Sequence, residues 1–252
     1  MPIFGKLDVQ TAAARAPLLR GLDTAAWELK GAEILQLSYE IAEAPAEYLI
    51  PPALHPSIPP YATLSVARFP TSPVGPFSLA QVRIIVRAGI RPRGYLLQAY
   101  TDAAQAATEL RARWGFTVGL GRITLQARHD RVISHVERDG QLILAMELEN
   151  PEQISGSDIT YLDSLHLARV MDSGKETPII VQVDPEYVFH SAARGRPRLV
   201  MLQADAWGGN HRLQCTNPMA ATYTRCDTDL PKLRFVLDPA VPAVEGSRRL
   251  SA

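Results

Sequence analysis

The segment RARWGFTVGLGR, residues 111–122, has the outline of an active-site entrance but carries no ionisable side chain at its centre. A tryptophan, a glycine and a phenylalanine end a predicted helix, and Thr117, Val118 and Gly119 follow. An amine nucleophile would have to be a lysine, because arginine keeps its proton in proteins. The chain has four lysines and 22 arginines, so amine chemistry has few candidates: Lys6, Lys30, Lys175 and Lys232.

Metal-binding and acid–base motifs are weak in this sequence. The metalloprotease HExxH, the serine-hydrolase GxSxG and the Walker motif are absent. His129 and His135 lie six residues apart in an expected hairpin, so we predict no metal site. His166 lies in an apolar setting, which is typical of a hydrogen-bonded core histidine. Cys215 and Cys226 do not form a CxxC pair, and we expect free thiols.

The composition is that of an ordinary globular protein, with 46% hydrophobic and 21% charged residues. The formal net charge is zero, so no basic field is available to hold nucleic acid or anionic lipid, and neither is expected as a partner. The N-terminus has no apolar region of signal-peptide length, and no run of 18 apolar residues exists. We therefore expect a cytoplasmic protein that does not enter a membrane.

The residue patterns predict an α+β fold with a mostly antiparallel sheet, because short alternating segments follow one another directly. The clearest helix is 102–115, with Asp102 as its N-cap and Gly115 as its stop. Asp139 and Gly140 form a pair typical of a hairpin turn. We expect the sheet to curl into a barrel-like shape around an internal apolar pocket. The expected strands are 32–42, 61–69, 79–89, 93–101, 122–128, 131–138, 141–149, at least two within 177–202, and one within 231–239.

The predicted organisation is one large domain with two short flanking segments. Residues 1–29 are expected to be helical, with Asp8 as a helix cap. Residues 30–240 form the domain, and residues 241–252 are expected to be a flexible tail.

Several segments, in order, resemble the acetoacetate decarboxylase family over about residues 30–238. AEYLIPPAL (46–54) resembles the family's Leu/Val-Pro-x-x-Leu segment, and SVARFPTSPVGPF (65–77) resembles its Gly-Pro-aromatic loop. RGYLLQAYTDAAQAATELRARWGF (93–116) resembles the strand and helix that deliver the nucleophile, while YLDSLHLARV and VMLQADAWGG fall where later strands should be. The resemblance implies a deep apolar pocket, homo-oligomers and a Schiff base between a β-keto acid and a lysine whose pKa is lowered by a neighbouring cation.

The sequence departs from the family at each reactive position. The nucleophile position is Val118, the acidic position is Leu79, and the position of the first-strand arginine is near Ala32. Three polar functions have become apolar or small, so we infer that imine chemistry has been lost. The residues expected to line the pocket are Ala32, Leu64, Leu79, Trp114, Phe116 and Val118.

Two sets of side chains could supply replacement chemistry. Lys30 lies two residues before Ala32, so an early strand start would point both side chains the same way and bring an amine into the pocket. The polar candidates for catalysis without an amine are Tyr95, Gln98, Arg122 and Glu147.

The leading hypothesis is a cofactor-independent enzyme that no longer uses a lysine imine. It would catalyse cyclisation, dehydration or isomerisation of a hydrophobic, polyketide-like metabolite by holding it in a folded conformation. One alternative is a non-catalytic binder of small ligands, a pseudoenzyme. The other is a decarboxylase or aldolase-type lyase that uses Lys30.

Overall fold

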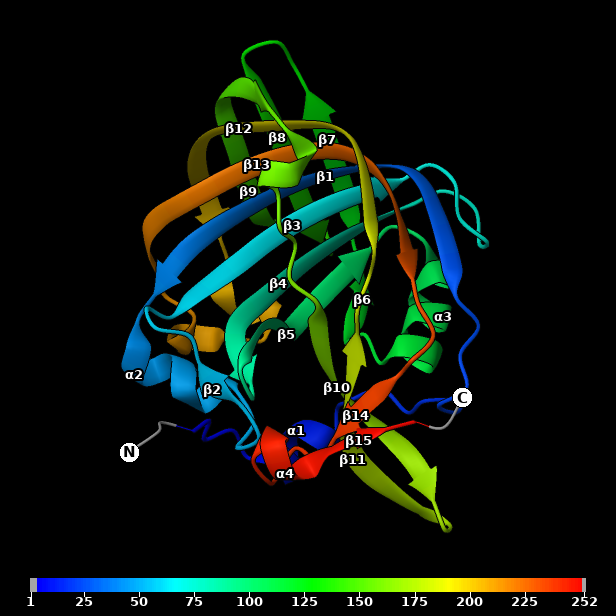
Figure 1. Cartoon of the computed structure of the whole chain (residues 1–252). Coiled ribbons are helices and arrows are strands. Elements are labelled where there is room, and N and C mark those ends of the chain that lie inside the picture. Colours follow the sequence, from blue (N-terminus) through cyan, green and yellow to red (C-terminus); the bar gives the residue numbers. More distant parts are fainter. Residues whose placement is uncertain (1–3, 251–252) are drawn as a thin grey trace.

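A strongly curved sheet of 15 strands makes up most of the molecule (Figure 1). The structure, a computed structural model, describes residues 4–250. The helices are α1 (Val9–Ala13), α2 (Glu43–Ala46), α3 (Ala104–Trp114) and α4 (Ala243–Gly246), with short 3₁₀ turns η1 (Glu47–Leu49), η2 (Gly156–Asp158), η3 (Ala204–Trp207) and η4 (Asn210–Arg212). The strands are β1 (Trp27–Ile41), β2 (His55–Pro56), β3 (Tyr61–Phe69), β4 (Phe77–Ala88), β5 (Arg91–Thr101), β6 (Val118–Leu120), β7 (Arg122–Ala127), β8 (Arg131–Arg138), β9 (Gln141–Ile154), β10 (Ser164–Asp172), β11 (Lys175–Val183), β12 (Tyr187–Leu202), β13 (Cys215–Leu230), β14 (Phe235–Leu237) and β15 (Ser247–Arg249).

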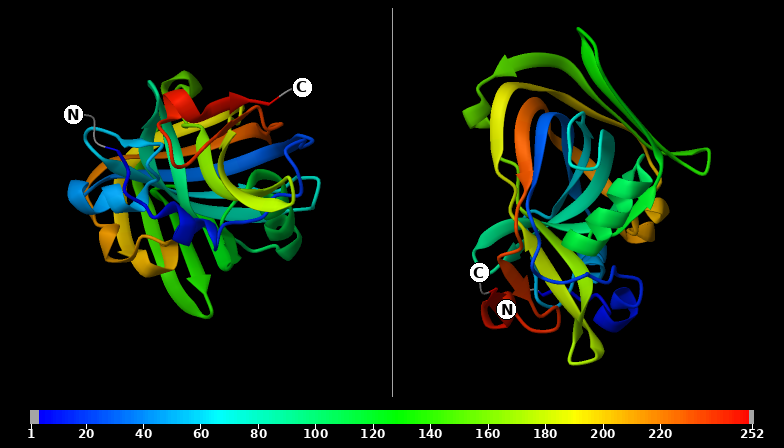
Figure 2. Two further views of the ribbon diagram at one scale, coloured as in Figure 1. Left: turned by 90° about the horizontal axis from the view of Figure 1, so that it is seen from below. Right: turned by 90° about the vertical axis from the view of Figure 1, so that its right-hand side faces the viewer.

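The sheet is mixed, but most of its neighbouring strands are antiparallel. The order is β15-β14-β11-β10-β5-β4-β3-β1-β13-β12-β9-β8-β7, with β2 paired to β4 and β6 paired to β5. The parallel pairs are β10 with β5 and β5 with β6. The α+β class is therefore confirmed, and α3 lies beside the sheet (Figure 2).

The expectation of a closed, barrel-like sheet is wrong. A barrel requires the two end strands to hydrogen-bond to each other. Here β7 and β15 stand at opposite ends of the strand order, and β15 is a three-residue strand paired with β14. The β7–β8 hairpin projects away from the rest of the molecule, so the sheet curves without closing (Figure 2).

Strands β1, β3 and β4 are buried on both faces, and their side chains alternate between two apolar clusters. One cluster includes Leu35, Leu37, Leu64, Val66, Ala80 and Val82. The other includes Ile34, Ala67, Phe69, Leu79, Phe116 and Val118. The pleat thus directs the buried side chains of these strands to one cluster or the other.

Helix α3 begins and ends close to where the sequence predicts. Gly115 ends it in the left-handed conformation, with φ of 67°, which confirms its expected role. The N-cap is Ala103, not Asp102, and it makes no side-chain cap bond. The Asp102 carboxylate instead accepts the backbone N–H of Ser78 at 2.6 Å, which ties the start of the helix to β4.

The structure of the two flanking segments differs from the structure that the sequence predicts. Asp8 does cap a helix, by accepting the backbone N–H groups of Gln10 and Thr11, but α1 has only five residues. Proline at position 17 cannot donate the hydrogen bond that would continue it. At the other end, α4 and β15 occupy most of the expected tail, and β15 is hydrogen-bonded to β14. No helix among residues 4–250 is long and apolar enough to cross a membrane.

Replacing Gly115 by alanine is expected to lower the free energy of unfolding by about 2–4 kcal/mol. The new methyl group would meet strain at positive φ and would lie 2.8 Å from Cβ of Ala168. Gly174→Ala is the matched control, because Gly174 also has positive φ but has nothing within 4 Å of an added Cβ. It should lose about 1 kcal/mol. Urea unfolding followed by tryptophan fluorescence measures both, and equal losses would contradict the packing argument.

Candidate functional site

A cavity lies against one face of the central strands, on the side of the second apolar cluster. The cavity is narrow: its volume for the centres of water-sized molecules is about 60 Å³. Strands β1, β3 and β4 form one wall, and the segments around Tyr161–Ser164 and Val183–Tyr187 form the opposite wall. Much of the lining is aromatic, from Phe69, Phe77, Phe116, Tyr161 and Tyr187.

A row of polar side chains crosses the strand wall of this cavity. Gln36 of β1 is paired with Ser65 of β3, and Ser65 is paired with Gln81 of β4. Residues paired directly across a sheet point to the same face, so these three side chains lie side by side. All three line the cavity. The wall is therefore a polar stripe between apolar rows, suited to orienting a ligand with a few oxygen atoms.

Arg83 lies two residues beyond Gln81 on the same face of β4, and it is only 7% exposed. Its Nη1 donates to the carbonyl oxygen of Leu162 at 3.2 Å, and its Nη2 donates to Oε1 of Gln36 at 3.1 Å. Burial lowers the pKa of Arg83 from its ordinary value. The guanidinium is thus a fixed, buried cation at the wall of the cavity.

Two tyrosines face the strand wall from the opposite side. The rings of Tyr161 and Tyr187 meet edge to face with centroids 5.1 Å apart. The Tyr161 hydroxyl is 2.9 Å from Oγ1 of Thr224. Burial raises the pKa of Tyr161 to about 12 and raises that of Tyr187 as well. Both phenols therefore keep their protons near neutral pH and can donate hydrogen bonds.

Ser164 and His166 form a buried hydrogen-bonded pair at the edge of the cavity. Nδ1 of His166 is 2.7 Å from the carbonyl oxygen of Trp114, which can only accept, so Nδ1 carries the proton. Nε2 then accepts the hydroxyl of Ser164 at 2.7 Å. Burial lowers the pKa of His166 to about 4. The histidine is neutral and fully hydrogen-bonded, as its apolar setting in the sequence predicts.

The expected pocket residues are divided between several places. Leu79 and Phe116 line the cavity. Val118 and Ala32 are buried in the apolar cluster beside it, although neither belongs to the cavity lining. Leu64 faces the other cluster, because the pleat turns its neighbour Ser65 toward the cavity.

Trp114 supports the cavity from behind. Its side chain is fully buried, packs edge-on against Trp27 at 5.0 Å between centroids, and donates from Nε1 to the carbonyl oxygen of Pro231 at 2.8 Å. It anchors α3 to the end of β13 and is absent from the cavity lining.

The structure places the amine of Lys30 outside the cavity. The β1–β13 pairing shifts register between Leu29 and Ala32, where Gly31 adopts φ of 65°. This bulge breaks the alternation that would have aligned Lys30 with Ala32. Leu29 lines the cavity, whereas Lys30 is exposed and lies 3.8 Å from a carboxylate oxygen of Glu28.

The four polar candidates are not brought together. Tyr95 is buried in the other apolar cluster, and Gln98 donates to the carbonyl oxygen of Ala99 beside an outer groove. Arg122 is exposed on the edge strand β7, near Glu137. Glu147 is on β9, 3.6 Å from Nη1 of Arg198. None of these four lines the cavity, because spacing along the chain does not reveal which face of a bent strand points inward.

The cavity's polar residues were missed, although the sequence contains a signal for some of them. In FSLAQVRIIV, polar residues at 81 and 83 interrupt an otherwise apolar strand at every second position. Such a pattern indicates polar groups that share one face of a buried strand. The structure buries Arg83 but exposes Arg87, near the end of the same strand.

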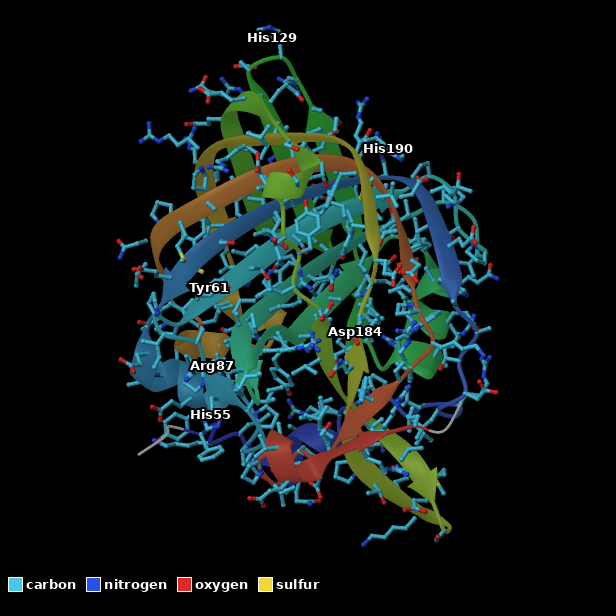
Figure 3. The ribbon with its side chains drawn as sticks, in the orientation of Figure 1. His55, Tyr61, Arg87, His129, Asp184 and His190 are labelled. Carbon is cyan, nitrogen blue, oxygen red and sulfur yellow. The ribbon has the colours of Figure 1, made fainter. Side chains whose placement is uncertain are left out.

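Histidines and cysteines form no metal cluster in the part of the chain that the structure describes. His129 lies at the tip of the β7–β8 hairpin, far from the cavity (Figure 3). Cys215 and Cys226 are free thiols, as expected. Asp184, labelled in the same figure, is not a ligand either; one of its oxygens lies 3.8 Å from Nη1 of Arg93.

Residues 16–239 match the family model described as acetoacetate decarboxylase (ADC), which covers most of the chain. The chain belongs to the acetoacetate decarboxylase family. No curated protein matches it. Several solved structures share its fold at 14% sequence identity, a level that bears on the fold alone.

One of these structures is the acetoacetate decarboxylase of Legionella pneumophila, with a TM-score of 0.70 over 83% of this chain and 86% of that chain. A second is the enduracididine biosynthesis enzyme MppR complexed with pyruvate, with a TM-score of 0.67 over 91% and 92%. A third is an acetoacetate decarboxylase-like enzyme from Sphingomonas wittichii RW1, with a TM-score of 0.67 over 91% and 94%. The fold of this chain is thus shared with an enduracididine biosynthesis enzyme.

The buried His166 gives a testable dependence of stability on pH. Its pKa is about 4 in the folded protein and about 6.5 in the unfolded chain, so between these values only the unfolded chain takes up the proton. The free energy of unfolding therefore decreases as the pH falls through this window. At pH 4.5 it should be lower than at pH 7 by on the order of 2–3 kcal/mol. Urea unfolding of wild type and His166→Gln at both pH values should show this extra loss in wild type alone. Equal losses in the two proteins would contradict it.

Proposed function

We propose that this protein is an enzyme of the ADC family that works without a lysine imine. The observation that carries the proposal is the composition of the cavity: among the described residues that line it, none is a lysine. The lining offers neutral phenols, amides and hydroxyls together with one carboxylate, Asp229. Such a set binds and polarises carbonyl oxygen atoms without forming a covalent bond to them.

Enolisation is the step that this set of groups supports best. A carboxylate such as Asp229 takes a proton from the carbon beside a carbonyl, and a neutral phenol such as Tyr187 donates a hydrogen bond to the oxygen that becomes an enolate. Intramolecular aldol cyclisation, dehydration of a β-hydroxyketone and shift of a conjugated double bond all begin in this way. The proposed reaction is therefore a cyclisation, dehydration or isomerisation.

The substrate that we propose is a hydrophobic, polyketide-like carbonyl compound of secondary metabolism. Aromatic side chains on both walls support an apolar substrate, and the polar row at Gln36, Ser65 and Gln81 supports one that carries several oxygen atoms. The fold that this chain shares with MppR, an enduracididine biosynthesis enzyme, supports a role in secondary metabolism.

Two alternatives remain as competing functions. A ligand-binding protein without catalysis would use the same cavity, and it would bind a ketone without moving its protons. A lyase that uses Lys30 would need this exposed side chain to leave Glu28 and Asp227, its neighbours at 3.8 and 3.9 Å, and to enter the cavity. The bulge at Gly31 opposes that movement.

Assembly and location are further parts of the proposal. We propose that the protein is cytoplasmic. We also propose that it forms homo-oligomers, which is what the family resemblance implies. Large apolar side chains that are about half exposed on β12 and β13 support the contact between copies: Val188, Val200 and Met219.

Borohydride treatment in the presence of pyruvate or acetoacetate tests the absence of an imine. The intact mass of the protein should stay unchanged, because no amine lines the cavity. A stable adduct that disappears in Lys30→Ala would overturn the proposal in favour of the lyase. Lys175→Ala is the matched control, because it changes another exposed lysine.

Deuterium exchange beside the carbonyl of benzylacetone, followed by NMR, tests enolisation. The protein should accelerate exchange, and Tyr187→Phe should slow it about 100-fold, because the oxyanion loses one donor. Tyr48→Phe is the control, because Tyr48 is 44% exposed and lies outside the cavity. Binding of benzylacetone without any acceleration would instead favour the ligand-binding protein.

A further inference from the structure

Two arginines are buried among the residues that the structure describes, and only one of them forms ion pairs. Arg93, 6% exposed, forms ion pairs with Asp163 and Asp184. Arg83, 7% exposed, forms no ion pair with any carboxylate among residues 4–250. An unpaired buried charge is costly, because the guanidinium loses its hydration and gains no opposite charge. The fold neutralises one buried cation and leaves the other uncompensated at the cavity.

The hydrogen bonds of Arg83 hold the guanidinium in place without neutralising it. Nη1 and Nη2 donate to neutral oxygens, the carbonyl of Leu162 and the amide of Gln36. The Nε–H group is buried and has no hydrogen-bond partner. A second unpartnered polar group on the same cavity is the buried hydroxyl of Thr228. Two buried donors of residues that line the cavity therefore have no acceptor.

Gly94 provides the room that Arg83 needs on the neighbouring strand. A Cβ atom at Gly94 would lie 3.0 Å from Cδ and 3.3 Å from Nε of Arg83. Any other residue at this position of β5 would press on the guanidinium. The local backbone is thus fitted to an arginine that contributes an unpaired charge.

Among the described residues, no titratable group around Arg83 forms an ion pair with it. Tyr161 and Tyr187 are neutral phenols, since burial raises the pKa of each, and His166 is neutral at its Ser164 hydrogen bond. Asp229 is the carboxylate that lines the cavity, but it makes no ion pair with Arg83. Its Oδ1 accepts the backbone N–H of Glu186 at 2.7 Å.

We propose that Arg83 binds an anionic oxygen of the ligand, a carboxylate or an enolate, through its free Nε–H group, with the Thr228 hydroxyl as a second donor. The site is a cation on β4. It differs from the position near Ala32 on β1, where the family resemblance places an arginine that this chain lacks. The inference deepens the proposed function, because it specifies the charge of the group that this cavity binds.

The test compares hexanoate with hexanamide, its neutral isostere, by calorimetry and thermal shift on the full chain. Wild type should bind hexanoate at least tenfold more tightly than hexanamide. Arg83→Met should lose this preference, and in the absence of ligand it should melt at the same or a higher temperature, because an unpaired buried charge has been removed. Arg87→Met is the matched control, because Arg87 lies exposed on the same strand near His55 (Figure 3). It should bind hexanoate like wild type.

Acetylacetone distinguishes the two sources of the anion. Tight binding of hexanoate assigns a carboxylate, whereas binding of acetylacetone that strengthens with its ionisation, and that Arg83→Met abolishes, assigns an enolate. Equal binding of hexanoate and hexanamide by wild type, with acetylacetone insensitive to Arg83→Met, would overturn the inference. The wild-type comparison holds even if the variant fails to fold. An imine adduct in the borohydride test would contradict the proposed function. It would leave the conclusion about anion binding by Arg83 unchanged.

Discussion

The structure depends on the pleat of three strands that are covered on both sides. Along β1, β3 and β4, successive buried side chains enter different cores. The register of the hydrogen bonds therefore also determines which side chains are buried in which core. Leu35, Leu64 and Val82 fill one core with apolar volume. Their neighbours Gln36, Ser65 and Gln81 form the polar row that faces the cavity. The apolar core fixes the register, and the register fixes the polar row.

The two buried arginines of this sheet differ in whether a carboxylate neutralises them. Arg93 and Arg83 are on adjacent strands, and both are buried. The first forms ion pairs with Asp163, just before β10, and with Asp184, just after β11. The second reaches a backbone carbonyl and a side-chain amide, which orient a guanidinium but carry no charge. The difference separates an arginine that stabilises the fold from one that gives the cavity its electrostatic character.

Local signals in the sequence predicted the regular elements well. The strand at 61–69 and the turn at Asp139 and Gly140 follow from alternation and turn chemistry, and both residues of that turn have positive φ. The family was identified from ordered segments, and the match over residues 16–239 confirms it. These features depend on residues that are near one another in the chain.

Features that depend on distant residues could not be predicted in this way. The sheet is open because its end strands, β7 and β15, do not pair with each other. Lys30 faces solvent because of one inserted residue at Gly31. The polar candidates were chosen by spacing, yet the cavity is lined by residues of several strands, which lie far apart in the chain. They come from β1, β3, β4, β13, the residue Phe116 after α3, and the segments Tyr161–Ser164 and Val183–Tyr187. The alternation at Gln81 and Arg83 indicates a shared polar face, but it does not reveal that Arg83 lacks a carboxylate partner.

The two-faced strands also constrain how such a protein can diverge. A deletion or insertion within β1, β3 or β4 would exchange the two faces, so it would place glutamines in the apolar core and leucines in the cavity at once. A substitution at a cavity position leaves the other core untouched. Descent within this fold can therefore replace reactive groups one at a time while every hydrogen bond of the sheet is kept. Leu79 and Val118, apolar where the family resemblance implies an acid and an amine, are the kind of change that such a scaffold tolerates.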